Sequence, residues 1–230
     1  MKKFIPILAY HSFNPQCFSG KLALAPELFK KQMLFLKKKN FYVVGLDQCV
    51  ENAWTENFWE QKAAITFDDG YLDNYHVAFP ALKECAFPGT FFVTPEDVGS
   101  TGFMTWDMLG EMARMPGVEI GSHGLFHKAL GDIPEDEAWK SISVSKKILE
   151  ERLGREIKAF SYPSGSFNEN IVEMVRRAGY VYACAASHVH DRKWEGNPFL
   201  LRRIKISSSS SSDFAFSLRL SGFYHSFGRP

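Results

Sequence analysis

The feature that most constrains the fold is an alternation of apolar, strand-like runs with helix-like segments along the chain. Candidate strands cover residues 5–10, 41–46, 63–67, 89–94, 118–121, 158–162, 180–186 and 200–206. Candidate helices cover residues 26–39, 47–54, 74–85, 106–114, 134–153 and 168–179. This order predicts a parallel sheet covered by helices, and the number of units favours a closed or nearly closed barrel over an open sheet.

Local signals mark the helix ends. Pro26 opens the first helix, Thr105 and Asn168 are N-cap residues, and Gly154 ends the longest helix. Pro80 is expected to split the helix over residues 74–85, because proline has no N–H to donate.

The chain of 230 residues, 45% of them hydrophobic, is large enough for one sizeable core. We therefore expect a single domain over residues 1–230. Its tail, from about residue 207, begins with six consecutive serines and is predicted to be a solvated loop, with a linker as the alternative.

Charge and apolar patterning exclude several classes of protein. A net charge of +1 gives no support for a nucleic-acid partner, and no run approaches the length of a membrane span. Lys2 and Lys3 imitate the start of a signal peptide, but Pro6 and His11 interrupt the apolar run, which fits a buried strand better. Four scattered cysteines without a C-x-x-C pair are typical of reduced thiols, so we expect a cytoplasmic protein.

Three polar clusters follow candidate strands. Asp68 and Asp69 follow residues 63–67, His123 and His127 follow residues 118–121, and Tyr162-Pro163-Ser164 ends residues 158–162. In a barrel of parallel strands the carboxyl ends meet at one rim, so we expect these clusters to converge there.

Two imidazoles and one carboxylate form a common site for zinc or another divalent first-row metal. If the loop is helical, the spacing of four puts His123 and His127 on one face. Asp69 would be the third ligand, leaving a position open for water, while Asp68 would take a proton from that water. Gly70 allows the tight turn that two adjacent aspartates need.

The sequence TFDDG, then H-x-x-x-H, then a Y-P-x-G loop resembles the polysaccharide deacetylases, the NodB-homology domain of carbohydrate esterase family 4. The segments ILAYHSF and LLRRI resemble the branch that acts on bacterial surface polysaccharides. The resemblance implies a distorted (β/α) barrel of seven strands. It also implies metal-dependent removal of N-acetyl groups from an acetylated amino sugar.

By position, the resemblance makes Asp68 the general base and Asp69, His123 and His127 the ligands of one divalent ion. Zn2+ is the first choice, with Co2+, Ni2+ or Fe2+ as alternatives. A backbone N–H of the loop that holds Pro163 and Ser164 would stabilise the oxyanion. Tyr162 and Trp106 are candidates for stacking on the sugar, with core or rim packing as the alternative for both.

Three positions depart from the family pattern. Gly124 stands where a Ser or Thr usually braces the loop, and no Arg precedes Tyr162 to orient the base. We expect Arg203 to supply that charge. In the family, a histidine near the end of the domain usually acts as the general acid, and this sequence has no clear match for it. His11 is better placed to be that acid than His188, His190 or His225.

Two other functions stay open at this stage. The same fold could hydrolyse a different amide, such as a cyclic amide or imide, or the chain could be a sugar-binding domain without catalysis. The sequence leaves the sugar, its linkage or carrier, and the oligomeric state undetermined.

Overall fold

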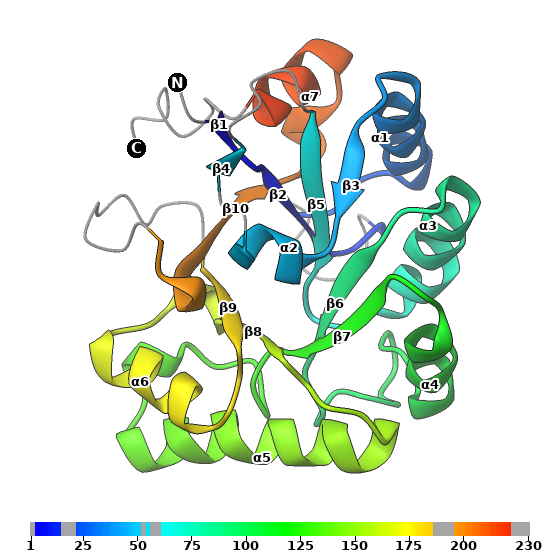
Figure 1. Ribbon diagram of the computed structural model, residues 1–230. Coiled ribbons are helices and arrows are strands. Elements are labelled where there is room, and N and C mark those ends of the chain that lie inside the picture. The colour runs from blue at the N-terminus through cyan, green and yellow to red at the C-terminus, as the bar shows by residue number, and fades with distance from the viewer. Residues whose placement is uncertain (1–2, 15–21, 52–53, 56–60, 186–195, 222–230) are drawn as a thin grey trace.

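The computed structural model describes residues 3–14, 22–51, 54–55, 61–185 and 196–221. Its centre is a closed ring of parallel strands in the order β2-β10-β9-β8-β7-β6-β5, with β5 pairing back to β2 (Figure 1). The strands are β2 (Ile7–Tyr10), β5 (Lys62–Phe67), β6 (Gly89–Val93), β7 (Val118–Ser122), β8 (Ala159–Ser161), β9 (Tyr182–Ala185) and β10 (Leu201–Lys205). The predicted distorted barrel of seven strands is confirmed.

The candidate strand at residues 41–46 lies outside the ring. It forms β3 (Tyr42–Val44), which pairs with the first half of β5, whereas β6 pairs with the second half through Thr66 and Phe67. Two partners thus share one side of β5, which distorts the barrel. The first candidate strand is divided near Pro6 into β1 (Lys3–Phe4) and β2, and β1 pairs antiparallel with β4 (Trp54–Thr55).

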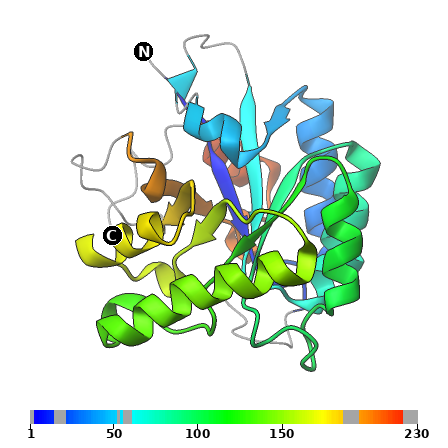
Figure 2. The same ribbon diagram turned by 60° about the horizontal axis from the view of Figure 1, so that its bottom comes forward.

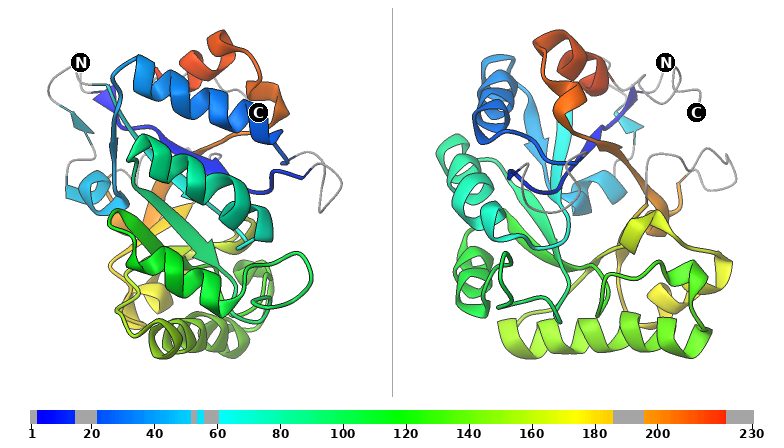
Figure 3. Two further views of the ribbon diagram at one scale, coloured as in Figure 1. Left: turned by 90° about the vertical axis from the view of Figure 1, so that its right-hand side faces the viewer. Right: turned by 180° about the vertical axis from the view of Figure 1, so that it is seen from behind.

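Helices cover the outside of the barrel. They are α1 (Pro26–Lys38), α3 (Phe79–Cys85), α4 (Trp106–Arg114), α5 (Glu135–Leu153), α6 (Glu169–Arg177) and α7 (Asp213–Leu220), and the short α2 (Leu46–Glu51) lies against the amino ends of the strands. Figure 2 brings α5 to the front, and Figure 3 shows α1, α3 and α4 side by side on one flank. No helix in the described part of the chain is long and apolar enough to cross a membrane.

The predicted helix signals act as expected. Thr105 and Asn168 accept hydrogen bonds from N–H groups in the first turns of α4 and α6, and Gly154 ends α5 with a φ of 63°. The helix over residues 74–85 is split into a π turn, Asn74–Ala78, and α3, with Pro80 in the first turn of α3. Single 3-10 turns occupy Leu130–Asp132, Pro163–Gly165, Pro198–Leu200 and Ser208–Ser210.

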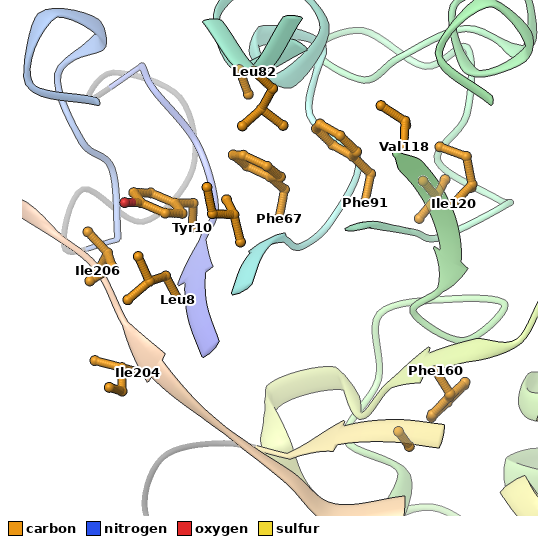
Figure 4. Close-up of a cluster of buried hydrophobic side chains, with 14 of the residues drawn as sticks. Leu8, Tyr10, Phe67, Leu82, Phe91, Val118, Ile120, Phe160, Ile204 and Ile206 are labelled. Atoms are coloured by element: carbon orange, nitrogen blue, oxygen red, sulfur yellow. The ribbon is translucent and has the colours of Figure 1, made fainter. Parts of the chain in front are cut away.

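Alternation along the strands divides the core into two layers. Outward side chains pack beneath the helices, where the rings of Phe67 and Phe91 stack with centroids 4.4 Å apart (Figure 4). Inward side chains such as Phe92 fill the barrel. A Cβ at Gly121 would lie 2.6 Å from the Phe92 ring, so this position needs glycine. Burial of each such phenylalanine stabilises the folded state by about 1.5–3 kcal/mol relative to leaving the side chain exposed.

The serine run is not the solvated loop expected from its composition. Ser208–Ser210 forms a 3-10 turn, Ser210 is 1% exposed, and its carbonyl accepts a hydrogen bond from Gln32. Ser212 caps α7, which packs on α1 through an edge-to-face contact of Phe216 with Phe35. A low-complexity run thus supplies turn and cap hydroxyls. Cys49, Cys85 and Cys184 are buried and free, and Cys17 lies outside the described residues.

Candidate metal centre and active site

The polar clusters converge at the carboxyl ends of the strands. One pocket there is lined by Ala9, His11, Asp68, His123, His127, Tyr162, Ser164, Gly165, Arg203 and Lys205. These residues come from β2, β5, β7, β8 and β10 or from the loops that follow them. The rim expected from the strand-helix alternation is therefore where the candidate chemistry collects.

Asp69, His123 and His127 form a compact set of possible metal ligands. Asp69 Oδ1 lies 3.4 Å from Nε2 of each histidine, and the three ligand atoms lie within 4.8 Å of one another. The loop that carries the histidines is not helical, so the helix-face argument from their spacing does not hold. Bends in that loop bring the two rings to a centroid distance of 5.1 Å instead.

The donor set fits a divalent cation. The Nδ1 of His123 lies 2.8 Å from the Ser161 carbonyl, which makes Nδ1 the protonated nitrogen and leaves a lone pair on Nε2. Asp69 Oδ1 is buried and has no hydrogen-bond partner among the described residues. A buried carboxylate oxygen without a donor, facing two imidazole nitrogens, is the environment that a bound cation satisfies.

The turn after β5 separates the two aspartates. Asp69 and Gly70 have φ angles of 74° and 77°, so two consecutive residues are left-handed. Glycine adopts this conformation freely and aspartate at a modest cost, in line with the role expected for Gly70. The turn leaves Asp68 in line with the inward side chains of β5, while Asp69 reaches the histidines.

Asp68 is held by Arg203 rather than by a residue before Tyr162. The Nη1 and Nη2 atoms of Arg203 donate to the two carboxylate oxygens of Asp68 at 2.6 and 2.7 Å. Nη1 and Nη2 also donate to the hydroxyls of Thr66 and Ser161 at 3.2 and 2.8 Å. Burial alone would raise the pKa of Asp68, but the Arg203 guanidinium outweighs it and holds that pKa well below its usual range.

Two serines brace the histidine loop where the family's hydroxyl is absent. The Ser122 hydroxyl accepts from the Gly124 N–H at 3.1 Å, and the Ser141 hydroxyl accepts from the Leu125 N–H at 3.0 Å. Gly124 has a φ of 79°, and a Cβ there would lie 3.0 Å from the Ser141 hydroxyl. Glycine therefore fits this loop, and serines on β7 and α5 supply its hydrogen bonds.

His11 follows β2 and enters the pocket beside the base. Its Nε2 lies 3.8 Å from Asp68 Oδ2, and its carbonyl accepts a hydrogen bond of 2.7 Å from the Asn74 side chain. Burial lowers the pKa of His11, and the nearby carboxylates of Asp68 and Asp69 offset this only in part. His188, His190 and His225 lie outside the described residues.

The remaining predicted residues divide between the pocket and the core. Ser164 is exposed, lines the pocket and has a φ of 56° just after Pro163. Tyr162 is 1% exposed and donates its hydroxyl hydrogen to the Phe199 carbonyl, so its ring packs in the core rather than presenting a face to a sugar. Trp106 is not among the pocket residues, and the Arg152 guanidinium lies over its ring.

Sequence reasoning missed three contributors: Asp73, Ser161 and Lys205. Asp73 holds the loop after β2, Ser161 binds Arg203, and Lys205 lines the pocket. Ser161 and Lys205 alternate with buried apolar residues on β8 and β10. This period of two would have revealed them once the inward face of each strand was known.

The polysaccharide deacetylase family model matches residues 55–183, more than half of the chain. The protein YxkH of Bacillus subtilis (strain 168), provisionally named a polysaccharide deacetylase, is 26% identical over 208 residues, covering 90% of this chain and 73% of that protein. The poly-beta-1,6-N-acetyl-D-glucosamine N-deacetylase of Staphylococcus epidermidis is 26% identical over 167 residues, covering 67% of this chain and 58% of that protein.

Solved structures agree with these matches. The Streptococcus pyogenes deacetylase PplD, solved in complex with acetate, aligns with a TM-score of 0.78 at 26% identity, over 92% of this chain and 96% of that one. BC0361, a polysaccharide deacetylase from Bacillus cereus, shares the fold with a TM-score of 0.80 at 19% identity, over 95% of this chain and 69% of that one. On the match of its central segment and this fold, the chain belongs to the polysaccharide deacetylase family.

Proposed function

We propose that the chain is a metal-dependent hydrolase that removes the N-acetyl group from an acetylated amino sugar and releases acetate. One observation carries this proposal. A buried carboxylate, Asp68, is kept ionised by Arg203 beside a second carboxylate, Asp69, that faces two imidazoles in the same pocket. The acetate in the Streptococcus pyogenes relative is the product expected here.

Asp69, His123 and His127 would hold the cation through one carboxylate oxygen and two Nε2 atoms. Nitrogen and oxygen ligands of this kind make Zn2+ the first candidate, and Co2+, Ni2+ and Fe2+ suit the same set. When bound, such an ion lowers the pKa of a water molecule and polarises the acetamide carbonyl.

The side chains of this protein then divide the proton transfers. Asp68 accepts the proton of the attacking water on a carboxylate oxygen, and Arg203 keeps that oxygen ionised and oriented beforehand. The Ser164 N–H donates to the developing oxyanion. Attack of the water oxygen forms the new C–O bond and a tetrahedral intermediate, and the C–N bond breaks in the following step, when the amine leaves with a proton.

His11 is the proposed acid for the leaving amine. Its Nε2 lies 3.8 Å from Asp68, so the proton taken from water can pass from the carboxylate to this imidazole. Because burial lowers the pKa of His11, the ring gives that proton up readily to the amine nitrogen. The products are acetate and a free amino sugar.

The experiment that tests the proposal is a screen for acetate release. The purified protein is stripped of metal, reloaded with Zn2+, Co2+, Ni2+ or Fe2+, and offered nucleotide-linked, lipid-linked and polymeric acetamido sugars. Poly-beta-1,6-N-acetyl-D-glucosamine is included because it is the named substrate of the staphylococcal relatives. We expect release with at least one metal and none after chelation.

The Asp68→Asn variant is the matched control, since asparagine still accepts a hydrogen bond from Arg203. We expect it to retain the metal and to lose about 10²- to 10⁴-fold in rate, the usual contribution of a general base. Release at the wild-type rate would show that Asp68 is not the base.

The two alternatives have their own outcomes in the same assay. Turnover of cyclic amides without acetate release from any sugar would favour the second type of hydrolase. Bound metal without turnover would favour a sugar-binding domain. Against that alternative, Arg203 supplies the charge, and Ser122 and Ser141 the hydroxyls, that the family pattern has at other positions. The expected cytoplasmic location stays a prediction, which cell fractionation would check.

A further inference from the structure

Lys205 points to the mouth of the barrel because of its place on β10. Its neighbours Ile204 and Ile206 are fully buried beneath the outer helices, on the side occupied by Leu8 (Figure 4). Alternation along the strand therefore turns Lys205 to the inner side, two residues beyond the inward-facing Arg203. Lys205 is exposed and lines the same pocket as the candidate catalytic groups.

The register of β10 on β2 fixes what Lys205 has beside it. Lys205 pairs with Ala9, whose side chain also lines the pocket and is too small to cover the lysine. His11 lies two residues after Ala9, just past the end of β2. Lys205 and His11 therefore both line the pocket, one from β10 and the other from the loop after the adjacent β2.

The acidic groups of the pocket are already engaged. Both oxygens of Asp68 accept hydrogen bonds from Arg203, and Asp69 faces the two histidines. No carboxylate lies within ion-pair distance of the Lys205 ammonium among the residues that the structure describes. Lys205 is thus a cation at the pocket whose donors remain available to a ligand.

The charge balance of the site favours an anion. Among the residues that line the pocket, the one carboxylate, Asp68, is outnumbered by two cations, Arg203 and Lys205, while Asp69 belongs to the candidate metal ligands. A cleft with one sign of charge raises the local concentration of the opposite one. Arg203 directs its Nη donors to Asp68, Thr66 and Ser161, which leaves Lys205 as the residue able to meet an anionic group.

We propose that Lys205 binds an anionic oxygen of the substrate, a phosphate or carboxylate carried by the acetylated sugar or by its immediate neighbour. This inference rests on the proposed deacetylase function and names the substrate class within it. An ammonium group is a compact point charge that pairs with either oxyanion. Lys205 thus favours binding of anionic acetylated sugars over neutral ones.

The test compares three substrates that share an N-acetylglucosamine unit: a neutral oligosaccharide, one with a phosphate ester on that unit, and one with a neighbouring uronic acid. We expect the wild type to show a higher kcat/KM for at least one anionic substrate than for the neutral one, through KM. Comparison of kcat/KM between the phosphorylated and the uronic acid substrates shows which of the two oxyanions Lys205 binds. In Lys205→Met that anionic-to-neutral ratio should fall about 10- to 100-fold, and Lys205→Arg should restore much of it.

Lys158→Met is the matched control, because Lys158 is a similarly exposed lysine just before β8, at the opposite end of the barrel. It should leave the ratio unchanged. Equal ratios in the wild type and Lys205→Met, or an equal loss in Lys158→Met, would overturn the proposal.

A binding measurement separates this inference from the proposed function. Inorganic phosphate and glucuronate are titrated calorimetrically into the metal-loaded wild type and into Lys205→Met. Lys205-dependent binding without acetate release from any sugar would leave the anion site standing and reject the deacetylase. Acetate release with neither a charge preference nor Lys205-dependent binding would support the deacetylase and reject the anion site. Absence of both acetate release and Lys205-dependent binding would reject both proposals.

Discussion

The Arg203 guanidinium spans β2 to reach the Asp68 carboxylate, with two hydrogen bonds of 2.6 and 2.7 Å. The two residues belong to β10 and to the end of β5, which are separated by β2 in the ring. The register places Ala9 of β2 between Thr66 and Lys205, so a small inward side chain leaves room for the arginine to cross. The same contact therefore links β10 to the end of β5 across β2 and keeps the candidate base ionised.

Breaking this pair is expected to destabilise the fold strongly. Arg203→Met leaves the Asp68 charge buried without a partner, and such a loss costs about 3–5 kcal/mol. The double variant Asp68→Asn/Arg203→Met removes the charge as well and should cost less than the sum of the single changes. Urea denaturation of the three variants with the wild type gives the coupling free energy, and additive costs would show that the pair adds nothing to stability.

Metal binding is expected to depend on His127 more than folding does. His127 has a side chain that is 43% exposed, so His127→Ala should change the free energy of unfolding little. Loss of one of three ligands should weaken metal affinity by more than the roughly 10- to 100-fold that an outer-shell partner contributes. Equilibrium dialysis with Zn2+ measures this, and His76→Ala, at an exposed histidine on the π turn, is the control. Equal affinity in both variants would remove His127 from the ligand set.

Asp73 is expected to affect turnover through the position of His11. Its Oδ2 accepts hydrogen bonds of 2.7 Å from both the Ser12 hydroxyl and the Phe13 N–H, directly after His11. Asp73→Ala should therefore lower kcat of acetate release about 10- to 100-fold, because displacing a catalytic group by 1 Å has effects of this size. KM and metal content should change little, and Asp73→Asn, which keeps an acceptor, should recover part of kcat. A loss confined to KM would argue against this positioning role.

The candidate base and metal ligands could be predicted from the sequence because their placement depends on a local property. Asp68, Asp69 and His123 follow buried strands directly, and parallel strands bring their carboxyl ends together whatever the details of packing. The role of Arg203 could be predicted for a related reason, because Arg203 lies on the last strand of the same ring. For these residues, strand order and strand ends determine the position.

Other features depend on facts that a single strand does not contain. Tyr162 is one of the residues that line the pocket, but its neighbour Ser161 faces the inside of the barrel, so the ring of Tyr162 faces the helices. The exclusion of β3 follows from β5 changing partners at Thr66, a contact between distant segments. Composition likewise hid the cap formed by Ser212. Register and long-range pairing decide each of these outcomes.

Inside the amino end of the barrel, Glu119 is expected to make stability depend on pH. Its carboxylate accepts hydrogen bonds from the Tyr182 and Thr90 hydroxyls at 2.5 and 2.9 Å. Burial raises the pKa of Glu119 despite these bonds, so the folded state binds its proton more tightly than the unfolded state does. Its contribution to the free energy of unfolding is therefore largest below the ordinary glutamate pKa of about 4.3 and is lost as pH rises through the raised value.

Glu119→Gln should remove this dependence. The free energy of unfolding of the variant, measured by urea denaturation, should therefore rise relative to that of the wild type between pH 4 and pH 8. Glu119→Ala, which leaves two hydroxyls unpaired, should cost about 1–3 kcal/mol at both pH values. A wild type and Glu119→Gln that follow parallel curves would show that this carboxylate titrates normally in the folded protein.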